Sequence, residues 1–460
     1  MWTQAPRYRN IVHRRVSAIV DHLHPGRWNW TAIIHPLDER VERQSEAPLT
    51  FQTVRNLRYF WIDGLFAATS ENFYIGYIVL YALYFGANNE QIGWLSAIAN
   101  LMGALAFFPG ARLVEQWGKR KAIVVWGGGG IARAILILLA LFPLFITRPS
   151  LAVWLIIIFN GLRAFFANLS NPAWTALVAD LVPSNMRGRY FGSRNMVMVV
   201  AALVIAPLSG RLIGLGNDWS QSLPLGYQLA FGLAFVFGMG ATLSFYRLAE
   251  PVAAVKLKLS HHRGDLRRAL RNSPAFVGLI VSAFFFNMSL QISAPFFNVY
   301  LVNVLGASVG VVGVLAAVNS LTALFGQRIW GRALDKRGDT YVQLITGFLV
   351  PVLPLAWMFY TAPWQVSFTN GLGGFVWAGY NLANFNLLLR LTPDDQRPRA
   401  VALYQTAVFT SAVLGPLLGG YLADAFSYKF IFGLSGAGRF LGMVMFWLLT
   451  VRVLRKRQTS

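Results

Sequence analysis

The chain has 460 residues, of which 56% are hydrophobic and 13% are charged, with a mean hydropathy of +0.50 and a net charge of +22. Soluble domains carry about 25% charged residues, so this composition excludes an ordinary soluble protein and indicates a polytopic membrane protein. Cysteine is absent, which excludes a disulfide framework and thiolate chemistry.

The first 57 residues are basic and contain no apolar run that resembles a signal peptide, so we expect this segment to stay in the cytoplasm. Apolar residues recur at helical spacing between Val12 and Leu23. This spacing is compatible with an amphipathic helix on the anionic leaflet and equally with a solvated tail.

Twelve apolar runs follow, each close to the roughly 20 residues that cross a bilayer core. They lie at about residues 59–84, 91–109, 122–145, 151–174, 191–214, 227–247, 275–302, 308–327, 341–361, 364–388, 400–421 and 430–451. We number these runs as spans 1 to 12 and expect each of them to be a transmembrane helix.

The distribution of basic residues predicts the orientation of these spans. With a cytoplasmic N-terminus, the tails and every second connection hold 34 of the 40 Lys and Arg, whereas the other connections hold Arg148 and Lys429. Because positive residues are retained on the cytoplasmic side, we expect both termini to be cytoplasmic, in a cell (inner or plasma) membrane. This rule also explains the net charge without a nucleic-acid partner.

The two halves of the chain repeat one another. Gly86, Ala87 and Gly93 recur 220 residues later, and Asn160, Gly161 and Asn171 recur 210 residues later. Parallel repeats of this kind are typical of transporters. The predicted organisation is a basic cytoplasmic segment at 1–57, a six-helix bundle at 58–247, a basic cytoplasmic linker at 248–273, a second six-helix bundle at 274–452 and a basic tail at 453–460.

A loop motif repeats as well, as ARLVEQWGKRK at 111–121 and GRALDKRGD at 331–339. Each copy has an acid three residues before a glycine, and the glycine permits a turn with positive φ. The acid is placed to interact with helix N-termini and neighbouring arginines.

On these motifs the chain resembles the major facilitator superfamily over roughly residues 58–452. The family loop reads G-x-x-x-D-x-x-G-[RK]-[RK]; the second copy departs from it at Asp339, and the first copy has Ala111 and Glu115 in place of Gly and Asp. The resemblance implies twelve helices in two parallel six-helix repeats around a central cavity. It also implies that these loops gate the cytoplasmic side; the alternative is a basic turn without a gating role. The residues concerned are Glu115, Gly118, Arg120, Gly331, Asp335 and Gly338.

Spans 5 and 11 carry the related stretches APLSG (206–210) and GPLLGG (415–420). In the family, a G-P-x-x-G-G element in span 5 accompanies antiporters that export, and here span 5 keeps only part of it. Proline and small residues let helices bend and approach closely, so we expect packing seams where the halves meet. The seam residues are Pro207, Gly210, Gly415, Pro416 and Gly419.

The resemblance implies that spans 1, 4, 7 and 10 line the cavity, and each of these spans carries a polar stripe at helical spacing. A carboxylate at membrane mid-depth costs at least about 2.5 kcal/mol, so the acids of span 1 are expected to face inward. The candidate cavity residues are Asp63, Glu71, Asn72, Asn160, Arg163, Asn287, Gln291, Trp377, Tyr380, Asn381 and Asn384.

Glu71 and Arg163 both fall near the middle of their spans and are natural partners. One hypothesis is that Glu71 exchanges a proton or binds substrate in competition with Arg163; the other is a static salt bridge. Asp63 is expected nearer the cytoplasmic end, within reach of water, with Arg133 as a possible partner. Arg133 and Arg439 receive a structural interpretation, as arginines that snorkel or bind a carbonyl.

All six His lie outside the spans and no Walker-type loop is present, so we expect no cofactor, no metal site and no enzymatic activity. The predicted function is alternating-access secondary active transport of a small molecule by a monomer, coupled to protons. Trp377, Tyr380 and Phe285 slightly favour efflux of amphipathic compounds. The alternatives are uptake of a sugar or other nutrient, and a transporter-like receptor that does not transport.

Overall fold

The structure, a computed structural model, describes residues 50–146, 148–183, 186–220, 224–250, 273–391 and 397–454. The predicted N-terminal amphipathic helix, residues 251–272 of the predicted linker and the tail from residue 455 lie outside the described residues. The chain from Arg55 onward forms one compact unit, and Met1–Val54 form another, of which residues 50–54 are described.

Helices account for nearly all of the described chain. The first half contains α3 (Phe51–Tyr74), α4 (Ile78–Tyr84), α5 (Asn89–Trp117), α6 (Arg120–Ile123), the π-helical segment η2 (Val124–Ile131), α7 (Ala132–Leu141), the 3-10 turn η3 (Phe142–Leu144), α8 (Pro149–Leu169), α9 (Asn171–Leu181), α10 (Arg187–Trp219) and α11 (Leu225–Tyr246). The second half contains α13 (Pro274–Ser293), α14 (Phe296–Asn303), α15 (Val309–Arg337), α16 (Asp339–Leu349), α17 (Val352–Trp357), the 3-10 turn η5 (Pro363–Gln365), α18 (Val366–Leu391), α19 (Arg397–Ala425), α20 (Tyr428–Phe446) and the π-helical segment η6 (Trp447–Val451).

Each of the twelve predicted spans coincides with one of these helices or with consecutive helical segments, up to four of them in span 3, which confirms the predicted all-helical membrane fold. Within the described residues, ten helical stretches are long and apolar enough to cross a membrane. Spans 1 and 10, formed by α3 and α18, are not among the ten. Both carry polar stripes, with two acids in α3 and four asparagines in α18.

Several helices extend beyond the predicted spans into the basic connections. The stretch 110–121 was expected to be a loop, but α5 continues through it to Trp117, and α15 likewise continues to Arg337. A helix satisfies its own backbone hydrogen bonds in water as well as in lipid, so the end of the apolar run does not end the helix. Most of the loop motif is therefore the last two turns of a helix.

Positive-φ glycines mark the repeat in three dimensions. Among the described residues they are Gly86 (φ 82°), Gly118 (62°), Gly306 (71°) and Gly338 (82°), which form two pairs separated by 220 residues. Gly118 and Gly338 end the long helices α5 and α15, as the loop motif predicts. At the other end of α5, Asn88 and Gln91 form a capping box.

Breaks inside the spans also repeat. Span 1 is interrupted between α3 and α4 around Gly76, and span 7 is interrupted between α13 and α14 at Pro295. Span 3 contains the π-helical segment η2 at the glycine run 127–130, where Gly128 N donates to Ser170 Oγ at 2.6 Å. The glycines let α8 approach the backbone of span 3 more closely than side chains would allow.

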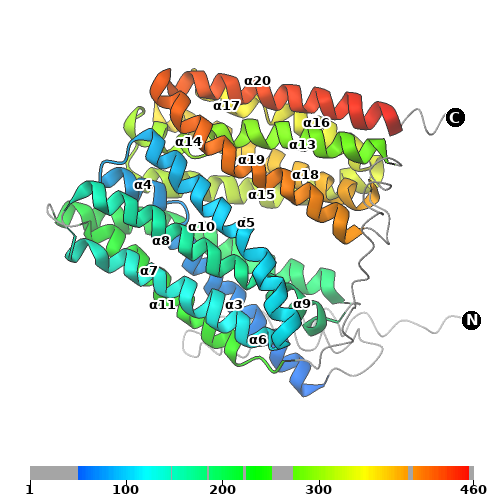
Figure 1. Ribbon diagram of the computed structural model, residues 1–460. Coiled ribbons are helices and arrows are strands. Elements are labelled where there is room, and N and C mark those ends of the chain that lie inside the picture. The colour runs from blue at the N-terminus through cyan, green and yellow to red at the C-terminus, as the bar shows by residue number, and fades with distance from the viewer. Residues whose placement is uncertain are drawn as a thin grey trace, which may run out of the picture. The chain divides into compact units, whose positions relative to one another are not determined.

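The halves lie side by side, with the first half in blue to green and the second in yellow-green to red (Figure 1). We call the end where α5 and α15 begin the hairpin end, and the end where they finish the basic end. Contacts between the halves run along α5 with α19 and along α10 with α15. A Cβ added at Gly93 would lie 2.6 Å from Pro416 O, and one at Gly210 would lie 2.8 Å from Val309 O. These helices therefore touch backbone to backbone.

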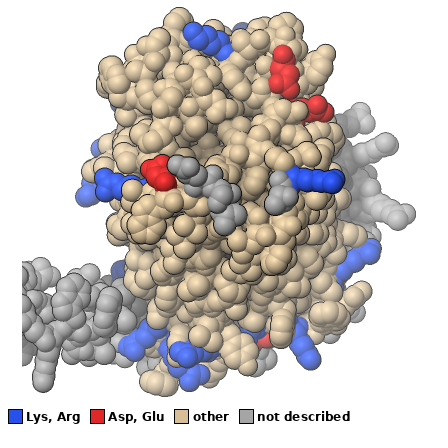
Figure 2. Space-filling view, turned by 90° about the vertical axis from the view of Figure 1, so that its left-hand side faces the viewer, with Lys and Arg blue, Asp and Glu red and all other residues tan. Residues whose placement is uncertain are grey.

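Figure 2 looks onto the hairpin end, where the described surface carries few and scattered charged side chains. Arg148 and Lys429 lie at this end, directly before α8 and in the first turn of α20. The basic end carries the ends of α5 and α15 and the beginning of α10. Basic residues are thus distributed over the described helix ends as the orientation argument requires.

An ion pair at the basic end is repeated with its charges exchanged. In the first half, Arg120 Nη1 lies 2.6 Å from Asp180 Oδ2 and joins the beginning of span 3 to the end of span 4. In the second half, Asp339 Oδ1 lies 2.8 Å from Arg390 Nη2 and joins spans 9 and 10. Arg390 follows Asp180 by 210 residues. The departure of Asp339 from the family loop is thus explained by the base at the end of span 10.

We predict that Asp339→Arg destabilises the protein by roughly 1 kcal/mol, because it places two cations together at a partly exposed site. Asp339→Arg combined with Arg390→Asp should restore the stability, since it copies the polarity of the first half. Thermal unfolding in lipid nanodiscs measures both effects. A double variant no more stable than Asp339→Arg alone would contradict the pairing.

Candidate functional site

A cavity of about 700 Å³ lies among the helices of the second half. Its walls come from α13 to α15 and α17 to α20, and it reaches Gly76 at the break in span 1. Polar and aromatic side chains share the lining. Polar lining residues are Asn287, Asn298, Asn319, Thr369, Asn370, Asn381, Asn384, Tyr404, Gln405 and Arg439.

Five of the candidate cavity residues line this cavity: Asn287, Trp377, Tyr380, Asn381 and Asn384. The other candidates, Asp63, Glu71, Asn72, Asn160, Arg163 and Gln291, are not among its lining residues. The cavity lining thus includes candidates from spans 7 and 10, whereas Gln291 of span 7 packs against α19 and, of the first-half candidates, Asn160 and Arg163 contact each other.

An aromatic cluster forms one wall. Tyr380 stacks on Phe286 with ring centres 4.9 Å apart, and Trp377 lies edge-on to Tyr380 at 5.3 Å. The expectation for Phe285 is wrong: this side chain is exposed away from the cavity lining, and its neighbour Phe286 packs against Tyr380 instead. Neighbouring residues on a helix differ in direction by about 100°, so a shift of one residue changes the face.

The amides of the cavity donate mainly to the protein. Asn287 Nδ2 donates to Ala283 O at 2.8 Å, Asn370 Nδ2 donates to Val366 O at 3.1 Å, and Asn384 Nδ2 donates to Tyr404 Oη at 2.8 Å. Each amide also has an oxygen that accepts hydrogen bonds. A bound molecule with hydroxyl or amide N–H groups is therefore matched to this wall.

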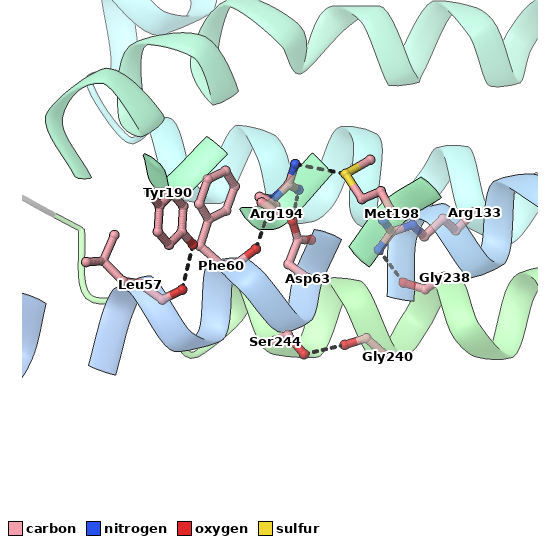
Figure 3. Close-up of polar contacts among 10 residues, drawn as sticks. All are labelled: Leu57, Phe60, Asp63, Arg133, Tyr190, Arg194, Met198, Gly238, Gly240 and Ser244. Atoms are coloured by element: carbon pink, nitrogen blue, oxygen red, sulfur yellow. Dashed lines mark hydrogen bonds and ion pairs between the residues drawn. The ribbon is translucent and has the colours of Figure 1, made fainter. Parts of the chain in front are cut away.

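Asp63 is held by a partner that the sequence analysis missed. Arg194 of α10 extends toward α3, and its Nη2 lies 3.1 Å from Asp63 Oδ2 (Figure 3). Arg194 Nε also donates to Phe60 O at 3.2 Å, and its guanidinium lies 4.4 Å from the Phe60 ring centre. Both charged residues are buried, with 6% and 7% exposure. The expectation that water reaches Asp63 is therefore wrong.

Gly64 makes room for this ion pair. A Cβ at this position would lie 2.6 Å from Arg194 Nε, so a larger residue would push the guanidinium away. Arg194 lies in the first residues of span 5, within the stretch RGRYFGSRN at 187–195, and the sequence analysis did not consider it as a partner of Asp63. The signal that could have identified it is a base within the first two turns of a span, opposite an acid in span 1.

Arg133, a possible partner of Asp63, donates instead to Gly238 O and Thr242 Oγ1 of α11. The sequence analysis named a carbonyl as the other possible partner, and this is the contact that forms. Gly238 has no side chain, and a Cβ there would lie 2.8 Å from Arg133 Cδ.

Glu71 and Arg163 do not form a direct ion pair. Arg163 Nη1 donates to Tyr74 Oη at 2.9 Å, and Arg163 Nη2 donates to Asn160 Oδ1 at 3.1 Å. Tyr74 lies almost one helical turn after Glu71 and reaches α8 in its place. The Glu71 side chain is exposed, and within the described chain it makes no hydrogen bond or ion pair. Asn72 beside it donates to Ala68 O of its own helix at 2.8 Å.

The residues of the repeated loop motif lie at the basic end. Glu115 and Asp335 are exposed and form no ion pair within the described residues, whereas Arg120 is buried between Asp180 and Glu250. Gly118 and Gly338 end their helices, and Gly331 lies inside α15.

Some of the predicted seam residues lie between the two halves, and others lie within the second half. Gly210 and Pro416 lie where the halves meet, against Val309 and Gly93. Gly415 and Gly419 instead pack α19 onto α13 within the second half: a Cβ on Gly415 would lie 2.5 Å from Gln291 Cβ, and one on Gly419 would meet Ile292 O. Pro207 lies inside α10, and the carbonyl before it accepts from Tyr77 Oη at 2.6 Å.

We predict that Asp63→Asn lowers the stability by about 3–5 kcal/mol, because it leaves the Arg194 charge buried without a partner. Asp63→Asn with Arg194→Gln should be less destabilised, since both charges are gone. Glu71→Gln serves as the matched control and should change little. Chemical or thermal unfolding in nanodiscs measures these differences, and wild-type stability of Asp63→Asn would refute the structural role.

Comparison with known proteins agrees with this architecture. The family model of the Major Facilitator Superfamily matches residues 60–297 and 279–460. The multi-drug resistance efflux pump PmrA homolog of Lactococcus lactis is 24% identical over 82% of this chain and 90% of its own length. The multidrug resistance protein MdtG of Dickeya zeae is 23% identical over 87% of this chain and 95% of its own length.

Solved structures share the fold. The nucleoside transporter NupG (D323A mutant) superposes with a TM-score of 0.68 at 13% identity, over 85% of this chain and 99% of that chain. A bacterial homolog of the human lysosomal transporter Spinster, inward-facing and unoccupied, superposes with a TM-score of 0.65 at 16% identity, over 88% and 95%. On the family match across both six-helix halves, this chain belongs to the major facilitator superfamily of membrane transporters.

Proposed function

We propose that the protein is a proton-coupled secondary transporter that exports small amphipathic organic compounds from the cytoplasm. The observation that carries this proposal is the cavity of about 700 Å³ lined by amides and aromatic rings within a membrane-spanning bundle. A cavity of this size accommodates a small organic molecule. The efflux names of the relatives, PmrA homolog and MdtG, support export over uptake.

The contacts between the halves support an inward-facing state. Near the hairpin end, Asn89 Nδ2 donates to Asp424 Oδ1 at 2.7 Å, and Tyr428 Oη donates to Asn89 Oδ1 at 2.6 Å. Past the middle of α5, Phe107 still contacts Phe409 with ring centres 5.8 Å apart. Beyond this point, the described parts of α5 and α19 share no further hydrogen bond or ring contact. With the basic end in the cytoplasm, as the positive-inside rule favours, we propose that the cavity opens toward the cytoplasm.

Glu71 is our candidate for the proton-coupling group. Its carboxylate is exposed and unpaired among described residues, whereas Asp63 is fixed by Arg194. Arg133, Arg163 and Arg194 lie close enough to act on the charge of Glu71. Movement of one half against the other changes these distances and with them the preference for the charged form. The other hypothesis, a static salt bridge with Arg163, has no such contact in this state.

Glu115 and Asp335 are our candidates for the gate on the cytoplasmic side. Both acids are exposed at the basic end, and both lie in the last turns of helices that contact the other half nearer the hairpin end. Closure of the basic end would bring these acids toward the basic helix ends of the other half. Ion pairs formed there would stabilise the closed form.

The proposal predicts compound-dependent proton movement in everted membrane vesicles. Vesicles from a host without its own multidrug pumps are energised to build an acidic interior, and cationic, neutral and anionic amphipathic compounds are added in turn. At least one class should dissipate the proton gradient only where the protein is present. Dissipation by sugars or nucleosides alone would instead establish a nutrient carrier, and no response to either panel would refute transport.

Glu71→Gln should reduce gradient-driven transport at least about tenfold and remove its dependence on the pH gradient, because the amide cannot carry a proton. Glu90→Gln is the matched control, since Glu90 is exposed at the beginning of α5. Both variants are assayed at several external pH values in the same vesicles. An unchanged pH dependence in Glu71→Gln rules out the coupling role.

A further inference from the structure

The charge of the second-half cavity is carried by Arg439. Among the residues that line the cavity, asparagine, glutamine, hydroxyl and aromatic side chains supply the polarity, and Arg439 of α20 is the charged one. The side chain is 2% exposed and is among the largest fully buried side chains of the described protein. A cavity with this lining has a single positive charge in its wall.

Arg439 has few partners for a buried guanidinium. Its Nη2 donates to Ser293 Oγ at 3.0 Å, and its Nε is buried without a hydrogen-bond partner. No carboxylate of the described residues forms an ion pair with it. By contrast, the buried Arg194 has Asp63, and the buried Arg120 has Asp180 and Glu250. Burying an uncompensated cation is costly, so a structural role alone is a poor explanation for a charge at this position.

The packing of α20 against α13 does not require this arginine. Gly438 lies against the Ser289 side chain and Gly442 against the backbone of Phe286, so the helices already touch on either side of Arg439. Ser435 Oγ donates to Ser289 O at 2.5 Å and is 2.9 Å from Ser293 Oγ. A neutral side chain could continue this hydroxyl chain without the cost of a buried charge.

We propose that Arg439 is the anchor for the anionic group of an organic anion bound in the second-half cavity, such as a carboxylate, sulfonate or phosphate. This inference rests on the proposed transport function and specifies its substrate class. An entering anion supplies the acceptor that the guanidinium lacks, through charge-assisted hydrogen bonds. The aromatic wall at Trp377 and Tyr380 packs the apolar body, and the amide oxygens of the cavity accept from its hydroxyl or N–H groups.

Direct binding tests the proposal without any transport assay. Purified protein in phosphatidylcholine nanodiscs is titrated calorimetrically with three probes that share one aromatic body: 1-naphthylacetate, its neutral amide, and 1-naphthylmethylammonium. The anion should bind roughly tenfold to a hundredfold more tightly than the amide, as expected for a hydrogen bond to a charged group. Tighter binding of the cation, or no binding of any probe, overturns the proposal.

Variants locate the preference. Arg439→Gln should bind the anion and the amide about equally, and Arg439→Lys should retain part of the preference because it retains the charge. Arg133→Gln is the matched control: it removes an arginine of the first half that does not line the cavity, and it should leave the preference unchanged. An anion preference that persists in Arg439→Gln overturns the assignment. The wild-type ranking alone decides the proposal if Arg439→Gln does not fold.

The source of the anion is distinguished by repeating the titration in phosphatidylglycerol nanodiscs. If the anionic probe binds more weakly there, the lipid headgroup competes with it for the anion site. If its binding is unchanged, the site takes a soluble anion. Transport and binding fail separately. Anion binding that depends on Arg439 with no vesicle transport would refute the proposed function alone, and transport without anion preference would refute this inference alone.

Discussion

Charge inside a low-dielectric bundle is the constraint on which much of this structure depends. Each charged side chain in the spans requires either a partner or a function, because desolvation without compensation costs several kcal/mol. The protein satisfies this requirement in different ways. Asp63 and Arg194 neutralise each other. Arg133 donates to the carbonyl of Gly238, which has no side chain to block the approach. Arg163 donates to the hydroxyl of Tyr74 and lies over its ring.

We assign functions to two groups that remain incompletely satisfied within the described chain. Glu71 has an exposed carboxylate without a partner in the described chain, and Arg439 has a buried guanidinium with one neutral contact. They lie in different halves, so the protein separates the candidate proton site from the candidate substrate site. Relative movement of the halves would then link the occupancy of one site to the accessibility of the other, which is the requirement for coupled transport.

Small residues allow the helices of the two halves to contact each other closely and still move relative to one another. Backbone-to-backbone contacts at Gly93 and Gly210 join the halves along two helix pairs. Such contacts involve few interlocking side chains, so one half can rock against the other around them. The ion pairs Arg120–Asp180 and Asp339–Arg390 hold adjacent spans together inside each half.

The sequence by itself determined the membrane class, the twelve spans, the parallel repeat and the positive-φ glycines of the loop motif. Hydrophobic length, repeat spacing and residue type are local properties, and a bilayer leaves few alternatives to helices. Helical periodicity also predicted polar faces on spans 7 and 10, and residues of both spans line the cavity.

The pairing of charges was decided only by the tertiary structure. The sequence left Arg133 as one possible partner of Asp63 and made Arg163 the natural partner of Glu71, and neither ion pair forms. The choice of Arg194 depends on Gly64, whose missing side chain lets α10 extend a guanidinium across α3. Likewise, the place of Arg439 at the cavity depends on how α20 packs on α13. Which face of one helix meets which face of another depends on the three-dimensional packing of side chains far apart in the sequence.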